Sequence, residues 1–131
     1  MPKIIGSYDP LKNSVIVDGT EIVGFDSSGV FAMSYNGDLT TPAEGIKGDI
    51  VFSENASRLA TLTITLLPNS PSINYLRSKA NSETEVSVID GNDGTKAVAT
   101  SKQCRIQKIP DKNGNSNSVS ISIFMPDVQE F

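Results

Sequence analysis

The chain has 131 residues, a formal net charge of −4 and a sequence pI near 4.7. This length suits a single domain with a sizeable core, which we expect to span residues 1–131. The 11 Lys and Arg residues are scattered along the chain rather than clustered, so the sequence lacks the basic patch of a tight nucleic-acid-binding protein.

The numbers of cysteine and histidine residues further restrict the range of possible functions. Cys104 is the single cysteine, which excludes an intrachain disulfide and favours folding in a reducing compartment. The chain has no histidine, so catalysis by Ser-His-Asp or Cys-His groups is impossible. The sequence shows no signal peptide and no apolar run of membrane-spanning length. We therefore expect a protein made in the cytoplasm that is not an enzyme, holds no cofactor and does not insert into membranes.

The first half of the chain is predicted to consist of short strands joined by turns. Asp18-Gly19 is the strongest local hairpin signal in the sequence. Residues 37–46 include Pro42 and Gly45 and are predicted to form a long polar loop, a candidate for a role in assembly. The strands expected here span about residues 14–17, 20–23, 29–35 and 47–53.

The second half is predicted to hold the central strand and the single helix. Residues 58–67 form the longest β-rich segment and have no interior glycine or proline. Ser70-Pro71 is typical of a helix N-cap followed by proline, and predicts a short helix over about 70–80. Further strands are expected at about 84–89, 95–100, 102–109 and 118–124. The predicted fold is mainly β, an antiparallel β-sandwich or partly open barrel of about eight strands with that one flanking α-helix.

Two of these strands alternate between apolar and hydroxyl side chains. Leu62, Ile64 and Leu66 fall on one face of the first strand, and Val119, Ile121 and Ile123 do so in the second, as the two-residue period of a strand requires. The opposite face is polar but uncharged, so it can meet water or a moving polyanion without holding it. Simple exposure to solvent is the alternative explanation. The residues concerned are Thr61, Thr63, Thr65, Ser118, Ser120 and Ser122.

Other motifs favour structural explanations. Residues 90–94, Asp-Gly-Asn-Asp-Gly, match a β-turn better than a calcium loop, because the spacing and the terminal glutamate of an EF-hand are missing. Cys104 has β-rich neighbours on both sides and is expected to be a buried, inert thiol. A metal-dependent hydrolase would need acidic residues to converge in space, and no spacing in the sequence forces them together.

A small β-sandwich exposes the edges of its sheets, and this chain lacks the dense edge lysines and prolines that would protect a monomer. Self-association through edge strands is therefore expected. The alternative is a small β-sandwich binding or adaptor module, which would need a concave site with exposed aromatic residues. The chain has no tryptophan for such a site.

Several of these segments occur together in a known family. The segments 8–10, 15–22, 24–25 and 61–72, in this order and with the helix in this place, resemble the tail tube proteins of contractile-tailed bacteriophages. The resemblance extends from about Tyr8 to the last strand. The hairpin and the threonine-rich strand followed by Ser70-Pro71-Ser72 carry it together.

The resemblance implies a structural virion protein. Its subunits would form hexameric rings that stack into the inner tail tube, through which DNA is ejected, inside a contractile sheath. Implied partners are other copies of the chain, the sheath, baseplate or terminator proteins and a tape-measure protein, with assembly in the cytoplasm of the bacterial host. Related tubes occur in R-type bacteriocins, other contractile injection systems and type VI secretion.

The resemblance also implies where subunits would touch. The hydroxyl face would line the lumen, and the 37–46 loop would reach the neighbouring ring. Short arms at residues 1–8 and 125–131 would lie across an adjacent subunit. The candidate contact residues are Leu39, Pro42 and Ile46 in the loop, and Ile4, Ile5, Val128 and Phe131 in the arms.

Overall fold

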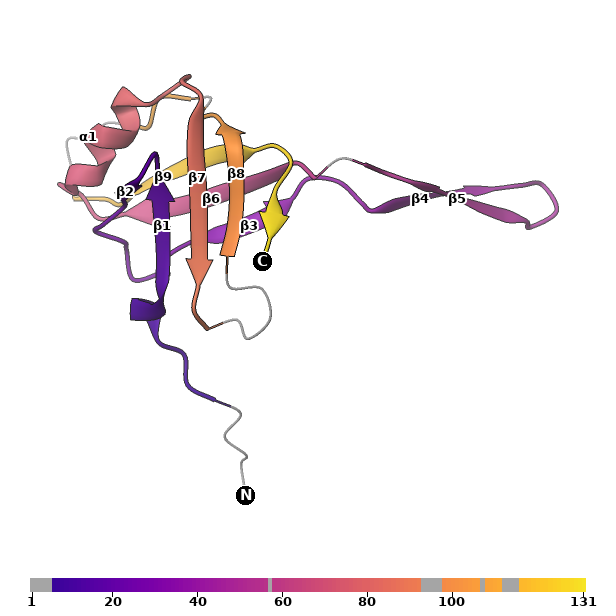
Figure 1. Ribbon diagram of the computed structural model, residues 1–131, viewed down its shortest axis with the longest axis horizontal. Helices are drawn as coiled ribbons and strands as arrows, with labels where there is room; N and C mark the ends of the chain where they lie inside the picture. The colour runs from indigo at the N-terminus through magenta and orange to yellow at the C-terminus, as the bar shows by residue number, and fades with distance from the viewer. Residues whose placement is uncertain (1–5, 57, 93–97, 107, 112–115) are drawn as a thin grey trace.

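The computed structural model describes residues 6–56, 58–92, 98–106, 108–111 and 116–131, which form two packed β-sheets, one α-helix and a projecting hairpin (Figure 1). A short 3-10 turn, Pro10–Lys12, precedes the first strand, and the helix α1 spans Pro71–Ser78. The described strands are β1 Asn13–Val17, β2 Thr20–Glu21, β3 Ala32–Tyr35, β4 Thr40–Glu44, β5 Ile50–Glu54, β6 Ala60–Leu66, β7 Thr84–Asp90, β8 Val98–Cys104, β9 Val119–Met125 and β10 Gln129–Glu130.

The two sheets are antiparallel and form a sandwich. One sheet has the order β10-β8-β7-β1-β2, and the other has the order β3-β6-β9. Figure 1 shows β6 and β9 running across the strands of the larger sheet. The two sheets meet where Arg105, just after β8, and Phe124 of β9 exchange two backbone hydrogen bonds of 3.0 and 2.9 Å. The predicted mainly-β sandwich with one flanking helix is confirmed.

The core lies between the sheets and follows the strand period. Leu62, Ile64 and Leu66 of β6 are buried, and their register partners Ile123, Ile121 and Val119 on β9 are buried beside them. Each such side chain contributes about 1.5–3 kcal/mol when it leaves water. The larger sheet supplies the facing layer, with Val15, Val17, Val86, Val88 and Ala99.

The helix α1 begins as the sequence predicts and closes one end of the sandwich. Ser70 is the N-cap, its hydroxyl accepts a hydrogen bond from the Ser72 N–H at 3.3 Å, and Pro71 occupies the first helical position. Ser70 also donates to the Val23 carbonyl at 2.7 Å, which ties the helix start to the segment after β2. Leu76 is fully buried, so the helix packs on the core through this face.

Two segments differ from the sequence prediction. Residues 37–46 are not a loop: β4 occupies Thr40–Glu44 and pairs along its length with β5. Residues 125–131 are not a free arm: Met125 ends β9, Val128 is buried in the core, and β10 pairs with β8. Both strands are stabilised by pairing with a distant or following segment, which local composition does not reveal. The sequence predicts two strands at 95–100 and 102–109, whereas the described residues of this region form one strand, β8.

Gly24 offers a test of how the helix cap is held. Its φ is +81°, and a Cβ there would lie 2.6 Å from the Ser70 hydroxyl oxygen. We expect Gly24→Ala to reduce the free energy of unfolding by about 2–3 kcal/mol, since it combines left-handed strain with damage to the cap. Gly19→Ala is the matched control, because Gly19 has φ +83° and a Cβ would meet no atom within 4 Å. Urea denaturation should show a loss of only about 1 kcal/mol for the control, and equal losses would contradict the proposed clash.

Candidate assembly surfaces

The hydroxyl residues predicted from the sequence lie together on the outer face of the smaller sheet. The register pairs Thr63 with Ser122 and Thr65 with Ser120, so the two stripes adjoin across the β6–β9 ladder. Ser120 and Ser122 are exposed, and Thr61, Thr63 and Thr65 are partly exposed. We call the outer face of β3, β6 and β9 the hydroxyl face.

Hydrogen bonds hold several of these hydroxyl groups in place. Thr65 and Ser120 bond to one another across the strands with their oxygens 3.2 Å apart, and Thr61 donates to the Asn36 side-chain oxygen at 3.0 Å. Ser118 precedes β9 and donates to the Asp26 carboxylate at 2.6 Å. This bond, followed by bonds from Ser28, lowers the pKa of the Asp26 carboxyl below its ordinary value. Ser118 therefore binds a carboxylate at the border of the face.

The three strands of the hydroxyl face carry no Asp, Glu, Lys or Arg side chain. β3 adds Ala32 and Ser34, which pair with Thr63 and Thr61, and β9 adds Phe124 beyond Ser122. By contrast, the outer side of the larger sheet presents exposed Glu21 and Glu85. The two outer surfaces of the sandwich thus differ in charge, and the smaller sheet provides the neutral one.

The smaller sheet also has open edges. In the described part of the chain, β3 and β9 each lie at an edge, with β6 between them. β9 is engaged on its other side near Phe124, where it bonds to Arg105. An edge strand presents backbone groups that can pair with another chain. The hydroxyl face can therefore be extended sideways by a second copy.

A two-stranded ribbon made of β4 and β5 projects from the sandwich (Figure 1). We call residues 38–55 the hairpin arm. Every residue of both strands is exposed, and Pro42 pairs with Phe52 in the register. A ribbon of this kind has little stability of its own in water, so its apolar side chains need a partner. The large exposed apolar residues on and beside it are Leu39, Ile46, Ile50, Val51 and Phe52.

The sequence identified only part of this surface. Leu39, Pro42 and Ile46 were candidate contact residues, and all three lie exposed on the arm. Ile50 and Phe52 lie in the segment predicted as a strand over residues 47–53, and they are 56% and 63% exposed rather than packed in the core. No strong local signal marks this hairpin: Gly45 and Gly48 suggest a turn, but the segment before them, Thr-Thr-Pro-Ala-Glu, has a proline and few residues that favour strands.

The predicted contact residues near the two ends of the chain are less accessible to a neighbouring subunit. Val128 is buried in the chain's own core, so it offers no surface to a neighbour. Phe131 is 65% exposed, but its backbone N–H and carbonyl both bond to Val98. Ile4 and Ile5 lie outside the described residues. At the N-terminal side, Asp9 is fixed by the Asn92 side chain, which accepts from its N–H and donates to its carbonyl, each at 3.0 Å.

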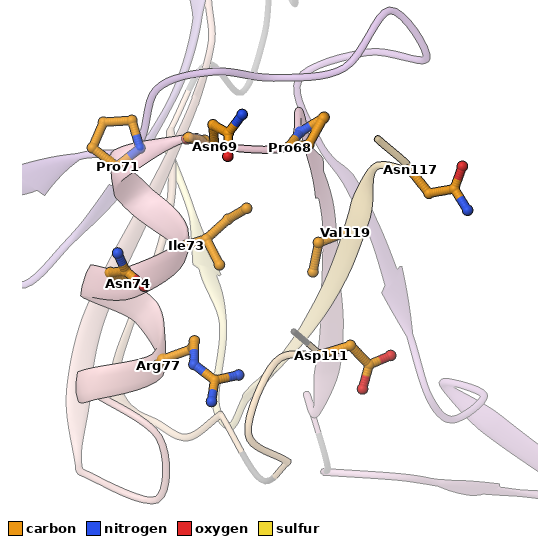
Figure 2. Close-up of a pocket in the computed structure, with 10 residues that line it drawn as sticks. Pro68, Asn69, Pro71, Ile73, Asn74, Arg77, Asp111, Asn117 and Val119 are labelled. Atoms are coloured by element: carbon orange, nitrogen blue, oxygen red, sulfur yellow. The ribbon is translucent and has the colours of Figure 1, made fainter. Parts of the chain in front are cut away.

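A hollow of about 410 Å³ lies between α1 and the start of β9, and the sequence did not predict it (Figure 2). Ile73 and Val119 face one another across it, and Arg77 and Asp111 lie on opposite sides of one end, with the Asp111 carboxylate turned away from Arg77. Arg77 also donates to the Pro110 carbonyl. We call this feature the helix pocket. It is lined by Pro68, Asn69, Ser70, Pro71, Ile73, Asn74, Arg77, Asp111, Asn117 and Val119.

The described residues contain few other groups that could react or bind a metal ion. Cys104 is fully buried, and burial raises the pKa of its thiol, as expected for an inert core cysteine. No group of three or more acidic, cysteine or histidine side chains lies close enough to hold a metal ion within the described ranges, and Asp93 falls outside them. None of the described helices has the length and apolar character needed to cross a membrane.

Comparison with solved structures finds this fold in large multi-protein particles. A chain of the native gene transfer agent virion has a TM-score of 0.67 at 12% identity, covering 95% of this chain and 99% of that one. A chain of the sheath-tube complex of the PVC extracellular contractile injection system, in its extended state, has a TM-score of 0.56 at 13% identity, covering 92% and 88%. A chain of the anti-feeding prophage cap, which terminates the AFP tube, has a TM-score of 0.58 at 10% identity, covering 99% and 95%.

By sequence, no protein-family model and no curated protein matches the chain. At identities of 10–13% the likeness shows the fold alone. The predicted resemblance to tail tube and injection-system proteins is confirmed at this level. The chain has the β-sandwich fold that occurs in components of contractile injection systems and of a virion particle.

Proposed function

We propose that this protein is a non-enzymatic structural subunit of a contractile tail or injection system, and that it assembles into hexameric rings stacked as the inner tube. The observation that carries the proposal is the hydroxyl face: a polar surface whose three strands carry no Asp, Glu, Lys or Arg, on a sheet with edge strands β3 and β9, of which β9 is engaged by Arg105 only near Phe124. The fold shared with chains of tube-containing particles supports it.

Edge pairing is the step that would close a ring. If β3 of one subunit lies beside β9 of the next, the smaller sheets continue from subunit to subunit and the hydroxyl faces form one surface. A closed ring leaves no open edge, which removes the tendency of such sheets to aggregate. The hydroxyl faces would then point to the lumen, and the charged outer side of the larger sheet would point to a surrounding sheath.

A lumen of this chemistry suits the passage of DNA. Lysine or arginine on the wall would bind phosphate groups and release counterions, which slows movement. Serine and threonine can form hydrogen bonds with water or phosphate without that electrostatic gain. The net charge of −4 adds weak repulsion of a polyanion.

Stacking of rings would fall to the hairpin arm. Leu39, Pro42 and Ile46, with Ile50 and Phe52, form an exposed apolar surface that one subunit cannot cover by itself. Contact with the neighbouring ring would bury them. Sheath, terminator or baseplate and tape-measure proteins would be the further partners, and the location would be the virion or particle after assembly in the host cytoplasm.

The first test is direct observation of assembly. We expect purified protein in a concentration series to form rings and hollow tubes with sixfold end views in negative-stain electron microscopy, with mass photometry counting the subunits. A protein that remains a monodisperse monomer at high concentration would overturn the tube proposal. The favoured function would then be that of a binding or adaptor module at a tail tip or baseplate.

The second test addresses the hairpin arm. We expect the double variant Ile50→Ser and Phe52→Ser to abolish tubes while leaving the thermal midpoint within about 2 °C of the wild type, because neither side chain packs in the core. Leu11→Ser is the control, since Leu11 is 91% exposed and lies outside the arm. Tubes should form normally with the control. Normal tubes from the double variant would show that the arm makes no essential contact.

The third test addresses the lumen. We expect the Ser122→Lys variant to assemble into tubes that retain short duplex DNA. This retention should fall steeply as the salt concentration rises from about 50 to about 200 mM, because DNA binding to lysine depends on the release of counterions. Gln103→Lys adds the same charge at an exposed position of β8, on the other sheet. Sedimentation of tubes with labelled DNA distinguishes the variants. Equal retention by both would mean that the hydroxyl face is not the lumen wall.

A further inference from the structure

The tip of the hairpin arm is built to present one aliphatic side chain. Gly45 donates its N–H to the Asp49 carbonyl at 2.7 Å, and Gly48 donates to the Gly45 carbonyl at 3.0 Å, which closes a tight turn. Gly48 has φ +89°, a conformation that favours glycine. Ile46 is completely exposed on this turn. An ordered turn that holds an isoleucine fully in water indicates a missing apolar contact.

Charged residues flank this isoleucine. Glu44 and Asp49 lie on either side of the turn, Lys47 follows Ile46, and no salt bridge engages any of these three within the described residues. The tip therefore offers one apolar side chain, a cation and two anions within six residues, 44–49. A complementary site would need an apolar slot with charges of both signs at its rim.

The helix pocket contains groups of each kind, within a lining that is polar at six of its ten residues. Ile73 and Val119 provide facing apolar walls, and Arg77 and Asp111 provide a cation and an anion at one end (Figure 2). The Asp111 side chain is 65% exposed and forms a 3.6 Å ion pair with the 86% exposed Lys108, so it remains accessible. The volume of about 410 Å³ is sufficient for a turn that inserts one side chain.

The tip and the pocket lie at opposite ends of the molecule. Figure 1 shows α1 at one end of the longest axis and the β4–β5 turn at the other. One chain cannot therefore bring its own tip into its own pocket. A contact between them joins two copies head to tail, and each copy then retains a free tip at one end and a free pocket at the other. Such a heterologous contact propagates into an open-ended stack.

We propose that the hairpin tip of one copy inserts into the helix pocket of a second copy, with Ile46 between Ile73 and Val119. Asp49 or Glu44 faces Arg77, and Lys47 faces Asp111. This inference rests on the proposed tube function and names the receiving surface for ring stacking. The occupant is a second copy of this chain because the charges of the tip complement those of the pocket. Docking also covers the exposed tip, which the isolated ribbon cannot do.

Disulfide trapping tests this contact. In a Cys104→Ala background, Ile46→Cys is combined with Asn74→Cys, an exposed position on the α1 side of the pocket. Tubes are first verified by electron microscopy and then oxidised. We expect a ladder of covalent multimers on non-reducing gels, because each copy carries one tip and one pocket. The matched control combines Ile46→Cys with Lys102→Cys, an exposed position on β8 outside the pocket, and should stay monomeric.

The outcomes separate this inference from the proposed function. Tubes that give no Ile46→Cys/Asn74→Cys ladder would overturn the docking site and leave the tube function standing. Covalent dimers without higher multimers would also overturn it, since they indicate a symmetric contact that cannot propagate. Equal ladders from the control would show that trapping is unspecific and would remove the support. Absence of tubes in the parental Cys104→Ala protein and in the wild type would overturn both proposals together.

Discussion

The strand β6 is the element on which the rest of the structure depends. It is the central strand of the smaller sheet, with β3 on one side and β9 on the other, and its Leu62, Ile64 and Leu66 supply much of the core. Because the side-chain period is two, the residues that alternate with them must face outward. A shift of one residue in register would bury Thr61, Thr63 and Thr65 and expose the leucines. One pairing register thus determines both the stability of the sandwich and the chemistry of its outer face.

The hairpin arm differs from the sandwich in that its apolar side chains are not buried in a core. In the part of the chain that the structure describes, its strands pair only with one another, and their apolar side chains remain in water. This arrangement costs the free monomer solubility, since exposed apolar ribbons favour association. Charged residues such as Glu44, Asp49 and Glu54 reduce that tendency without removing it. The proposed assembled state, in which the arm is covered, would account for a surface of this kind.

Local signals in the sequence were sufficient for much of the fold. Asp18-Gly19 turns with positive φ at both residues, Ser70-Pro71 starts α1, and the alternation in β6 and β9 places their hydroxyls on one face. The missed strands lack such signals. β4 reads Thr-Thr-Pro-Ala-Glu, which looks like a loop until β5 pairs with it, and β10 is two residues long. The helix pocket was unpredictable for a related reason: its walls, Ile73 and Val119, are brought together only by packing between segments far apart in the chain.

The two outward-facing features make opposite demands on side-chain chemistry, and the fold keeps them apart. A lumen wall must avoid strong attachment, so charge and large apolar groups are both unfavourable there. A stacking contact must instead hold its partner, which requires apolar burial and paired charges. In this chain the neutral hydroxyls lie on the continuous sheet, whereas Ile46 with Glu44, Lys47 and Asp49 lies on the projecting turn. Because the turn extends beyond the sandwich, its adhesive surface does not border the hydroxyl face, and each surface can meet its own requirement.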